Sequence, residues 1–469
     1  MTDSSLLAPA TERRTVAISR FLWAVYAAIA AALASFTLVQ WWSALSFEGP
    51  MVYGEGAVVN AGLLIARGLD PYGPPAAGVF VGANYPPLAY LVVAIGSAFG
   101  DFLPLRAVNV LAALAIAIAI AWRARASRLT ALALASSFLA LFPVLTWAPV
   151  ARVDMLAVAF TAFAILLAAP TWRRALPAGA LASLALYTKP TALLPLVAVL
   201  LYLAWREQRT AARVAVAFTA SSVLLVAFTF ERFEMQGIIT HVIRWNALPF
   251  APSIAALLLL VGVVTLGAFA LLGARSADGR MRAYVIGAVL VVILGGREGS
   301  TVNYLLDVAA ASCLALASRV RADTPRVPLT LAAQLAVGAA MIATAVLQPT
   351  DLAASRRQVT LAEDLPRAAT ILAEDSGVLL ANGITPVVDD LFLWSRLVAA
   401  GSIADEVTPR VRQAAFDFVI ADVPLDALDR ATEFERLRWP PALVRAVLDA
   451  YRLDVGVPGH FRYVPRRSR

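Results

Sequence analysis

The chain has 469 residues, of which 60% are hydrophobic and only 15% are charged. Soluble domains are about 25% charged, so this composition, with a mean hydropathy of +0.76, excludes an assembly of ordinary soluble domains. The net charge of +8 does not indicate nucleic acid, because the basic residues lie in short clusters between apolar stretches. Such clusters are typical of cytoplasmic loops that face anionic lipid. We therefore expect an all-α polytopic membrane protein that contacts membrane lipid and no nucleic acid.

The first apolar stretch, residues 21–45, follows Arg13, Arg14 and Arg20. This charge pattern is like that of a signal peptide, but the stretch is too long for a signal h-region. Gln40-Trp41-Trp42 near its end has the composition of a membrane interface. We predict a retained signal anchor with a cytoplasmic N-terminus.

Twelve apolar segments are candidate membrane spans, at residues 21–45, 86–100, 105–122, 129–147, 153–170, 175–188, 190–205, 212–230, 252–273, 283–295, 303–318 and 328–347. Arginine clusters follow every second segment, at Arg123/Arg125/Arg128, Arg173/Arg174, Arg206/Arg209/Arg213, Arg275/Arg280/Arg282 and Arg319/Arg321/Arg326. They share the side of the N-terminal arginines only if one early segment does not span. Residues 86–100 are short, open on a double proline and contain two glycines. We predict an interfacial or re-entrant helix there and about eleven transmembrane helices.

This topology places the residues that could carry chemistry on the outer side, in loops at 46–104, 148–152, 188–191, 231–251 and 296–302. The membrane domain spans residues 1–347, and residues 348–469 form a small extracytoplasmic domain because charged residues there alternate with short apolar runs. We predict an α/β fold for this domain, with strands at 377–381, 416–421 and 461–464 and helices at 389–400, 405–415 and 441–451.

Glu55 lies in the first outer loop, at the start of a helix expected over residues 56–67. An apolar face on that helix favours a position on the membrane surface. A carboxylate at its N-terminus is stabilised by the helix dipole and would lie where a lipid phosphate and a polar acceptor could meet. Glu55 is therefore either a catalytic carboxylate or an ordinary capping residue.

Lys189 is the only lysine in the chain. It could neutralise a phosphate as a flexible point charge, or it could simply extend to the membrane interface at a helix end. Arg152 and Asp154 lie at the same level and could bind a ligand or pair with each other. Arg297 follows Gly295-Gly296 and is a second phosphate-binding candidate, or part of a plain helical connection.

His241 and Arg244 lie in the outer loop at 231–251, where they could contact a sugar or an acceptor. The chain has only two histidines, which argues against a histidine metal cluster. The sequence contains no P-loop, dinucleotide fingerprint or Cys-x-x-Cys pair. We expect no cofactor and no metal site, and a bound divalent cation stays an open alternative.

Several outer-loop motifs resemble those of the GT-C membrane glycosyltransferases, which include protein mannosyltransferases and bacterial aminoarabinose transferases. The motifs are Tyr-Gly-Glu-Gly at 53–56, Gly-Leu-Asp-Pro-Tyr at 68–72, Tyr-Pro-Pro-Leu at 85–88, Ala-Arg-Val-Asp at 151–154, Tyr-Thr-Lys-Pro-Thr at 187–191 and Gly-Ser-Thr-Val-Asn-Tyr at 299–304. They occur in order over most of the membrane part. The tail, with FDFVIAD and FRYVPR, is similar to domains appended to some bacterial members.

The resemblance implies a GT-C-like fold, a polyprenyl-phosphate-linked sugar donor, and an acidic residue of the first loop that acts as base on the acceptor hydroxyl in an inverting single displacement. The family often has an acid where this chain has Gly54, which leaves Glu55 as the base and Glu48 in reserve. Residues that would bind the donor phosphate are Lys189, Arg152 and Arg297. Residues that could also contact substrate are Tyr85, Asp154, His241, Arg244 and Asn303.

We therefore expect a glycosyltransferase on the outer face of a bacterial inner membrane, acting on a glycan, lipid or protein acceptor. A transporter or flippase of a lipid-linked substrate is the chief alternative, since it also needs many helices and a few buried charges. A non-catalytic scaffold is a third reading.

Overall fold

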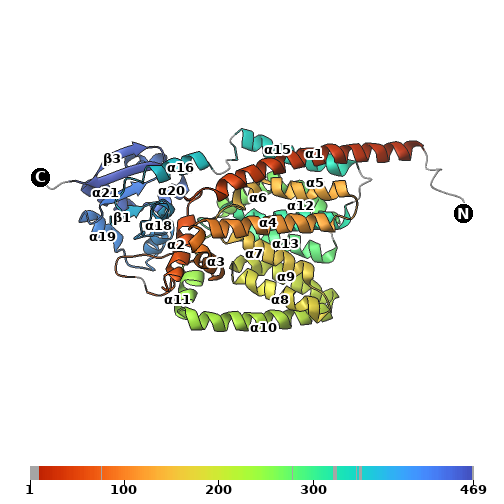
Figure 1. Ribbon diagram of the computed structural model, residues 1–469, viewed down its shortest axis with the longest axis horizontal. Coiled ribbons are helices and arrows are strands. Elements are labelled where there is room, and N and C mark those ends of the chain that lie inside the picture. Colours follow the sequence, from red (N-terminus) through yellow and green to blue (C-terminus); the bar gives the residue numbers. More distant parts are fainter. Residues whose placement is uncertain are drawn as a thin grey trace.

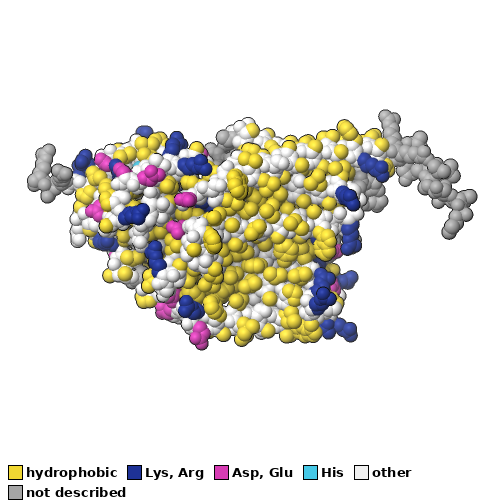
Figure 2. Space-filling view, viewed as in Figure 1, with side chains coloured by type: hydrophobic (Ala, Val, Ile, Leu, Met, Phe, Trp, Pro, Cys, Tyr) yellow, Lys and Arg dark blue, Asp and Glu magenta, His cyan; other side chains and the backbone are white. Residues whose placement is uncertain are grey.

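The computed structural model describes residues 10–74, 76–276, 278–320, 325–344, 346–347 and 351–466. A helical body forms one part, and a smaller part with a sheet lies at one end of it (Figure 1). On the face that Figure 2 shows, the surface of the body is largely apolar, whereas charged side chains gather at its two ends. The composition had indicated this arrangement for a helical membrane protein.

Within the described residues, eleven main helices of the body match the eleven predicted spans in order. They are α1 (Ala10–Leu45), α4 (Leu103–Arg123), α5 (Arg128–Ala140), α7 (Asp154–Leu167), α8 (Trp172–Leu186), α9 (Leu193–Arg206), α10 (Gln208–Arg232), α12 (Pro252–Ser276), α13 (Gly279–Leu294), α14 (Leu306–Arg319) and α15 (Arg326–Ala343). Five of them, α1, α4, α10, α12 and α15, are long and apolar enough to cross a membrane. The segment predicted at 129–147 is interrupted, because α5 ends before Pro143 and the short α6 (Phe142–Trp147) begins there.

α14 forms the centre of the body. Its side chains from Leu306 to Ala317 are buried on all sides, and it packs against α4, α5, α7, α12 and α13. Five alanines on this helix allow its neighbours to approach closely. Cys313 is fully buried there and serves as a packing residue.

The arginine clusters meet at one end of the body, here called the basic end. Arg280 donates to the Ala168 carbonyl at 2.6 Å and pairs with Glu207 at 2.7 Å, and Arg213 donates to the Pro170 carbonyl. Basic side chains, all of them arginines, gather at this end in Figure 2. The prediction that the clusters share one side is confirmed for these loops, whereas Arg321 lies outside the described residues.

The opposite end, here called the loop end, contains the first outer loop with α2 (Glu55–Ala66), α3 (Leu88–Gly96) and η2 (Ser97–Phe99). α3 has nine residues and is too short to span a bilayer, as predicted. The prediction that α2 lies on the membrane surface is wrong, because Glu55 to Leu63 are buried in protein. A Cβ on Gly56 would lie 2.2 Å from the backbone nitrogen of Gly377, so α2 is covered by the C-terminal part.

The C-terminal part contains a four-stranded sheet in the order β1-β2-β4-β3. Its strands are β1 (Ile371–Ala373), β2 (Phe418–Ala421), β3 (Tyr451–Val457) and β4 (His460–Pro465). β1 pairs parallel to β2, and the remaining pairs are antiparallel. The helices are α16 (Leu352–Thr360), α17 (Ser376–Ala381), α18 (Leu391–Ala399), α19 (Val407–Arg412), α20 (Glu433–Arg438) and α21 (Pro441–Ala450), with the short η6 (Leu425–Arg430).

The predicted α/β class, the strands at 416–421 and 461–464 and the three predicted helices are confirmed. The strand predicted at 377–381 is wrong. That segment is α17, whose N-terminus is capped by Asp375 through the Gly377 nitrogen, and short buried apolar runs do not distinguish the two structures. β1 and β3 were not predicted. The domain boundary at 347/348 borders residues outside the described ones and stays a prediction.

The hydrophobic core of the C-terminal part includes side chains from the body. Phe80 of the first loop is buried among Val388, Leu391 and Trp394, and its backbone pairs with Val388 in an isolated bridge. The C-terminal part therefore sits on the loop end through shared core residues.

Candidate active site

Glu55 is held in a buried ion pair. Its carboxylate lies 3.0 Å from Arg106, and both side chains are 0% exposed. The same carboxylate accepts hydrogen bonds from the backbone nitrogens of Met51, Val52 and Ala151. Arg106 also donates to the carbonyls of Ala44, Phe47 and Gly49. Glu55 thereby fastens the start of the first loop to α4 and to the loop at 148–152.

This placement differs from the one expected for a catalytic base. Glu55 does not line the cavity described below, and its two oxygens are occupied by protein donors. Glu48, the reserve candidate, is exposed to solvent and does not line that cavity either. These contacts are those of an anchor for the first loop, and the catalytic role of Glu55 stays a prediction.

A cavity of about 290 Å³ lies between the loop end and the C-terminal part, and we call it the central cavity. It is lined by Val52, Tyr53, Asn84, Tyr85, Trp147, Arg152, Asn246, Leu248, Arg297, Glu298, Gly299, Ser300, Thr301, Asn303, Tyr304, Asp390, Phe392, Leu393 and Phe434. Four of the predicted outer loops contribute residues to this cavity.

Two arginines form a cationic wall of the central cavity. Arg152 donates to the Tyr85 hydroxyl at 2.7 Å, and its Nε has no hydrogen-bond partner among the described residues. Burial lowers the pKa of Arg152, but nearby Tyr85 and Asp154 more than reverse this and raise it, so the guanidinium stays charged. Arg297 donates to the Asn246 carbonyl at 2.8 Å and to the Tyr304 hydroxyl at 3.0 Å. Charged guanidinium groups with an N–H that lacks a partner, such as the Nε of Arg152, can donate hydrogen bonds to a bound anion such as a phosphate.

Lys189 is buried next to this wall and does not itself line the central cavity. Its Nζ is 2.5 Å from Asp154 and 4.3 Å from the ring centroid of Tyr304. Burial lowers the pKa of Lys189, but Asp154 and Tyr304 reverse the effect and raise it. Lys189 therefore stays an ammonium and does not extend to the membrane interface.

Asp154 is the acceptor at the centre of this network. It accepts from Lys189, from Asn303 at 2.7 Å and from Trp147 at 2.8 Å. Asp154 thus pairs with Lys189 and not with Arg152, and Asn303 joins the same network. The structure brings together Arg152, Lys189, Arg297, Tyr85, Asp154 and Asn303, which are six of the predicted site residues.

His241 and Arg244 do not join the site. His241 is buried and packs on Trp245, with ring centroids 4.0 Å apart, and burial lowers its pKa to about 4. Arg244 is exposed. Among the described residues, no group of three or more His, Cys, Asp or Glu side chains could hold a metal ion.

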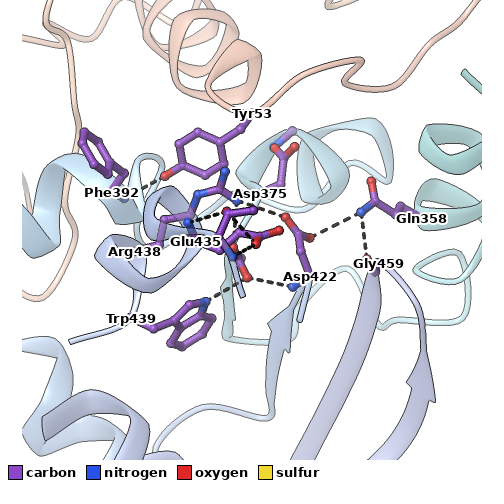
Figure 3. Close-up of polar contacts among 12 residues, drawn as sticks. Tyr53, Gln358, Asp375, Phe392, Asp422, Glu435, Arg438, Trp439 and Gly459 are labelled. Atoms are coloured by element: carbon purple, nitrogen blue, oxygen red, sulfur yellow. Dashed lines mark hydrogen bonds and ion pairs between the residues drawn. The ribbon is translucent and has the colours of Figure 1, made fainter. Parts of the chain in front are cut away.

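Sequence reasoning missed the contribution of the C-terminal part. Asp390 lines the central cavity, and its Oδ1 accepts from the Tyr53 hydroxyl at 2.9 Å. Figure 3 shows Tyr53 reaching from the first loop to Phe392 and Arg438. The signal in the sequence is the pair Asp389-Asp390 at the start of the helix predicted at 389–400, for which no chemical role was predicted.

A second, apolar cavity of about 260 Å³ opens beside the site, between α8, α10 and the first loop. We call it the side groove. Its lining residues are Pro86, Pro87, Ser183, Leu186, Tyr187, Ser222, Leu225, Val226, Thr229, Met235 and Ile238. Two of its lining residues are close in the chain to residues of the site. Pro86 follows Tyr85, and Tyr187 precedes Lys189 by two residues.

Solved structures share this architecture. ArnT from Cupriavidus metallidurans bound to undecaprenyl phosphate has a TM-score of 0.58 at 13% identity, covering 93% of this chain and 98% of that one. The apo state of the same protein has a TM-score of 0.57 at 12% identity, covering 92% and 97%. The chain has the fold of ArnT. The GT-C-like fold implied by the sequence motifs is therefore confirmed. No family model matches the sequence, and no curated protein is significantly similar to it.

Proposed function

We propose that the protein transfers a sugar from a polyprenyl-phosphate-linked donor to an acceptor of the cell envelope. The observation that carries this proposal is the cationic wall of Arg152 and Arg297, with Lys189 buried close to it and the apolar side groove alongside. A lipid phosphate needs both a cationic head-group site and an apolar surface for its chain. The likeness in fold to a protein bound to undecaprenyl phosphate supports the same ligand class.

The reaction proposed is an inverting single displacement, in which the acceptor hydroxyl attacks the anomeric carbon and the lipid phosphate leaves. Negative charge then builds up on the phosphate oxygens. Arg152 and Arg297 would stabilise that charge directly, and Lys189 from its buried position next to the wall. Removal of one preorganised donor of this kind typically costs about 2.7–4 kcal/mol of transition-state stabilisation.

A sugar donor on a lipid also agrees with the proposed orientation. The central cavity lies at the loop end, opposite the arginine clusters, and the positive-inside rule would place it on the outer face of a bacterial inner membrane. Nucleotide sugars are cytoplasmic, so an outer-face enzyme needs a lipid-linked donor.

A flippase is the alternative, and the packing of the body favours the enzyme. A route for a polar head group through the body would pass α14, whose central residues are completely buried against five neighbouring helices. The charged residues of the site gather at the loop end, as expected for chemistry at one surface of the membrane.

The test uses the purified full-length protein in lipid nanodiscs. Radiolabelled polyprenyl-phosphate sugars and a cell-envelope acceptor extract are supplied, and transfer and polyprenyl-phosphate binding are measured. We expect transfer by the wild type and at least a tenfold loss of polyprenyl-phosphate affinity in Arg152→Ala and Arg297→Ala. Arg452→Ala, an exposed arginine of β3, is the matched control. No transfer with any donor, or unchanged binding in both cavity variants, would refute the proposal.

A further inference from the structure

Asp390 comes from the C-terminal part and faces the central cavity. It directly precedes α18 and is 8% exposed. Both arginines of the cationic wall come from the helical body. Asp390 adds an acidic group to the part of the cavity lining that the C-terminal part contributes.

The hydrogen bonds of Asp390 leave one oxygen free. Oδ1 accepts from the Tyr53 hydroxyl at 2.9 Å and from the Leu393 nitrogen at 3.0 Å. No donor in the described part of the chain reaches Oδ2. A carboxylate oxygen without a partner, on the wall of a cavity, can accept a proton from a bound hydroxyl group.

The other carboxylates near the site are occupied. Both oxygens of Glu298 accept from Arg396, at 3.2 and 2.7 Å. Asp154 accepts from Lys189, Asn303 and Trp147, and Glu55 is enclosed by Arg106 and backbone nitrogens. Among the described acidic residues at the cavity, Asp390 is the one with an oxygen available.

Tyr53 holds Asp390 in place. The Tyr53 hydroxyl donates to Asp390 and accepts from the Phe392 nitrogen at 2.7 Å. The guanidinium of Arg438 lies 3.9 Å from the centroid of the Tyr53 ring (Figure 3). Arg438 is itself paired with Glu374 at 2.8 Å. A catalytic group fixed by supporting hydrogen bonds loses little freedom in the transition state.

Asp390 lines the same cavity as the two arginines of the cationic wall. Asp390 is among the acidic groups that raise the pKa of Arg152, after Tyr85 and Asp154 and against the effect of burial. The two side chains are therefore close enough to interact across the cavity.

We propose that Asp390 is the general base of the transfer, an inference that rests on the function proposed above. Oδ2 takes the proton of the acceptor hydroxyl as its oxygen forms the bond to the anomeric carbon. The bond from that carbon to the phosphate oxygen breaks, and its electron pair leaves with polyprenyl phosphate. Asp390 then releases the proton to water. The base thus comes from the C-terminal part, opposite the cations that receive the leaving group.

Asp390 also caps α18, and the test must separate capping from catalysis. Asn and Ser cap helices about as well as Asp, so Asp390→Asn and Asp390→Ser keep the cap and remove the base. Asp405→Asn is the matched control, because Asp405 accepts from the Thr408 nitrogen at 2.9 Å at the start of α19 and does not line the cavity.

The variants are assayed in nanodiscs for kcat, KM for the acceptor, polyprenyl-phosphate binding and thermal unfolding. We expect kcat to fall about 10²–10⁴-fold in Asp390→Asn and Asp390→Ser, with donor binding and the unfolding temperature close to wild type, and no change in Asp405→Asn. A kcat within threefold of wild type in either Asp390 variant would overturn the inference. So would a rise in KM alone, because that pattern assigns Asp390 to acceptor recognition. If the wild type transfers no sugar, the proposed function itself is wrong.

Discussion

At the scale of single residues, the fate of Glu55 shows how burial changes the meaning of a motif. A lone carboxylate in an outer loop looked reactive, but it forms a buried pair with Arg106 and accepts three backbone hydrogen bonds. Burying a charge is costly unless it is paired and hydrogen-bonded. The complete set of partners around Glu55 therefore indicates a structural anchor for the first loop.

Glu55→Gln is expected to destabilise the protein, because it leaves the Arg106 guanidinium buried without its counter-charge. Loss of one partner of a buried pair typically costs about 3–5 kcal/mol. Thermal or denaturant unfolding in detergent would measure this, with the exposed Glu48→Gln as control. A Glu55→Gln protein as stable as wild type but unable to transfer sugar would instead restore Glu55 as the catalytic base.

At the scale of elements, the contacts between α2 and the C-terminal part decide how the site is closed. Gly56 of α2 lies against Gly377 of α17 with no room for a side chain. Asp389 accepts from the Asn60 side chain at 2.9 Å and from the Gly82 nitrogen at 2.7 Å. These contacts bring the start of α18, and with it Asp390, to the central cavity.

Stability should depend on pH through this junction. Burial raises the pKa of Asp389 to about 7 from an ordinary value of 3.8, so between these values the folded state binds a proton that the unfolded state has lost. The contribution of Asp389 to the free energy of unfolding is full below about pH 4 and is lost as pH rises towards 7, by about 1.4 kcal/mol per pH unit at most. Burial raises the pKa of Asp375 to about 7 as well, with the same sign.

Unfolding temperatures measured from pH 5 to 8 would check this. We expect a decline in the wild type and a shallower decline in Asp389→Asn, because the amide does not titrate. A slope in Asp389→Asn equal to that of the wild type would show that Asp389 is not the source.

At the scale of the whole molecule, the two ends of the body have different chemistry. The described arginine clusters share the basic end, whereas the central cavity and the C-terminal part occupy the loop end (Figures 1 and 2). The positive-inside rule assigns the basic end to the cytoplasm. Substrate would therefore reach the cavity from the outer face.

Cysteine labelling tests this orientation. Cys313 is the only cysteine and is buried, so Cys313→Ala gives a background for single cysteines at the exposed positions Arg125 and Ser402. A membrane-impermeant maleimide should label Ser402→Cys in intact spheroplasts and Arg125→Cys only after lysis. The reverse pattern would place the cavity in the cytoplasm and remove the argument for an outer-face enzyme.

The sequence by itself determined the number and order of the main helices, the shared side of the arginine clusters and the placement of the candidate residues in loops at the other end. These features follow from hydrophobic length and local charge, which are properties of continuous segments. The cationic residues Lys189, Arg152 and Arg297 could also be predicted as site residues, because charged residues next to apolar segments of a membrane protein are rare. A strand was predicted where the structure has α17, because a run of five apolar residues is too short to show whether its hydrophobic pattern has the helical or the strand period.

Only the tertiary structure decided which carboxylate faces the cavity. Glu55 is enclosed because α4 and the loop at 148–152 meet around it, and Asp390 is exposed to the cavity because the C-terminal part packs on the first loop. Tyr53 and Asp390 are 337 residues apart in the chain. Contacts over such separations depend on how complete elements pack, and no local pattern in the sequence records them.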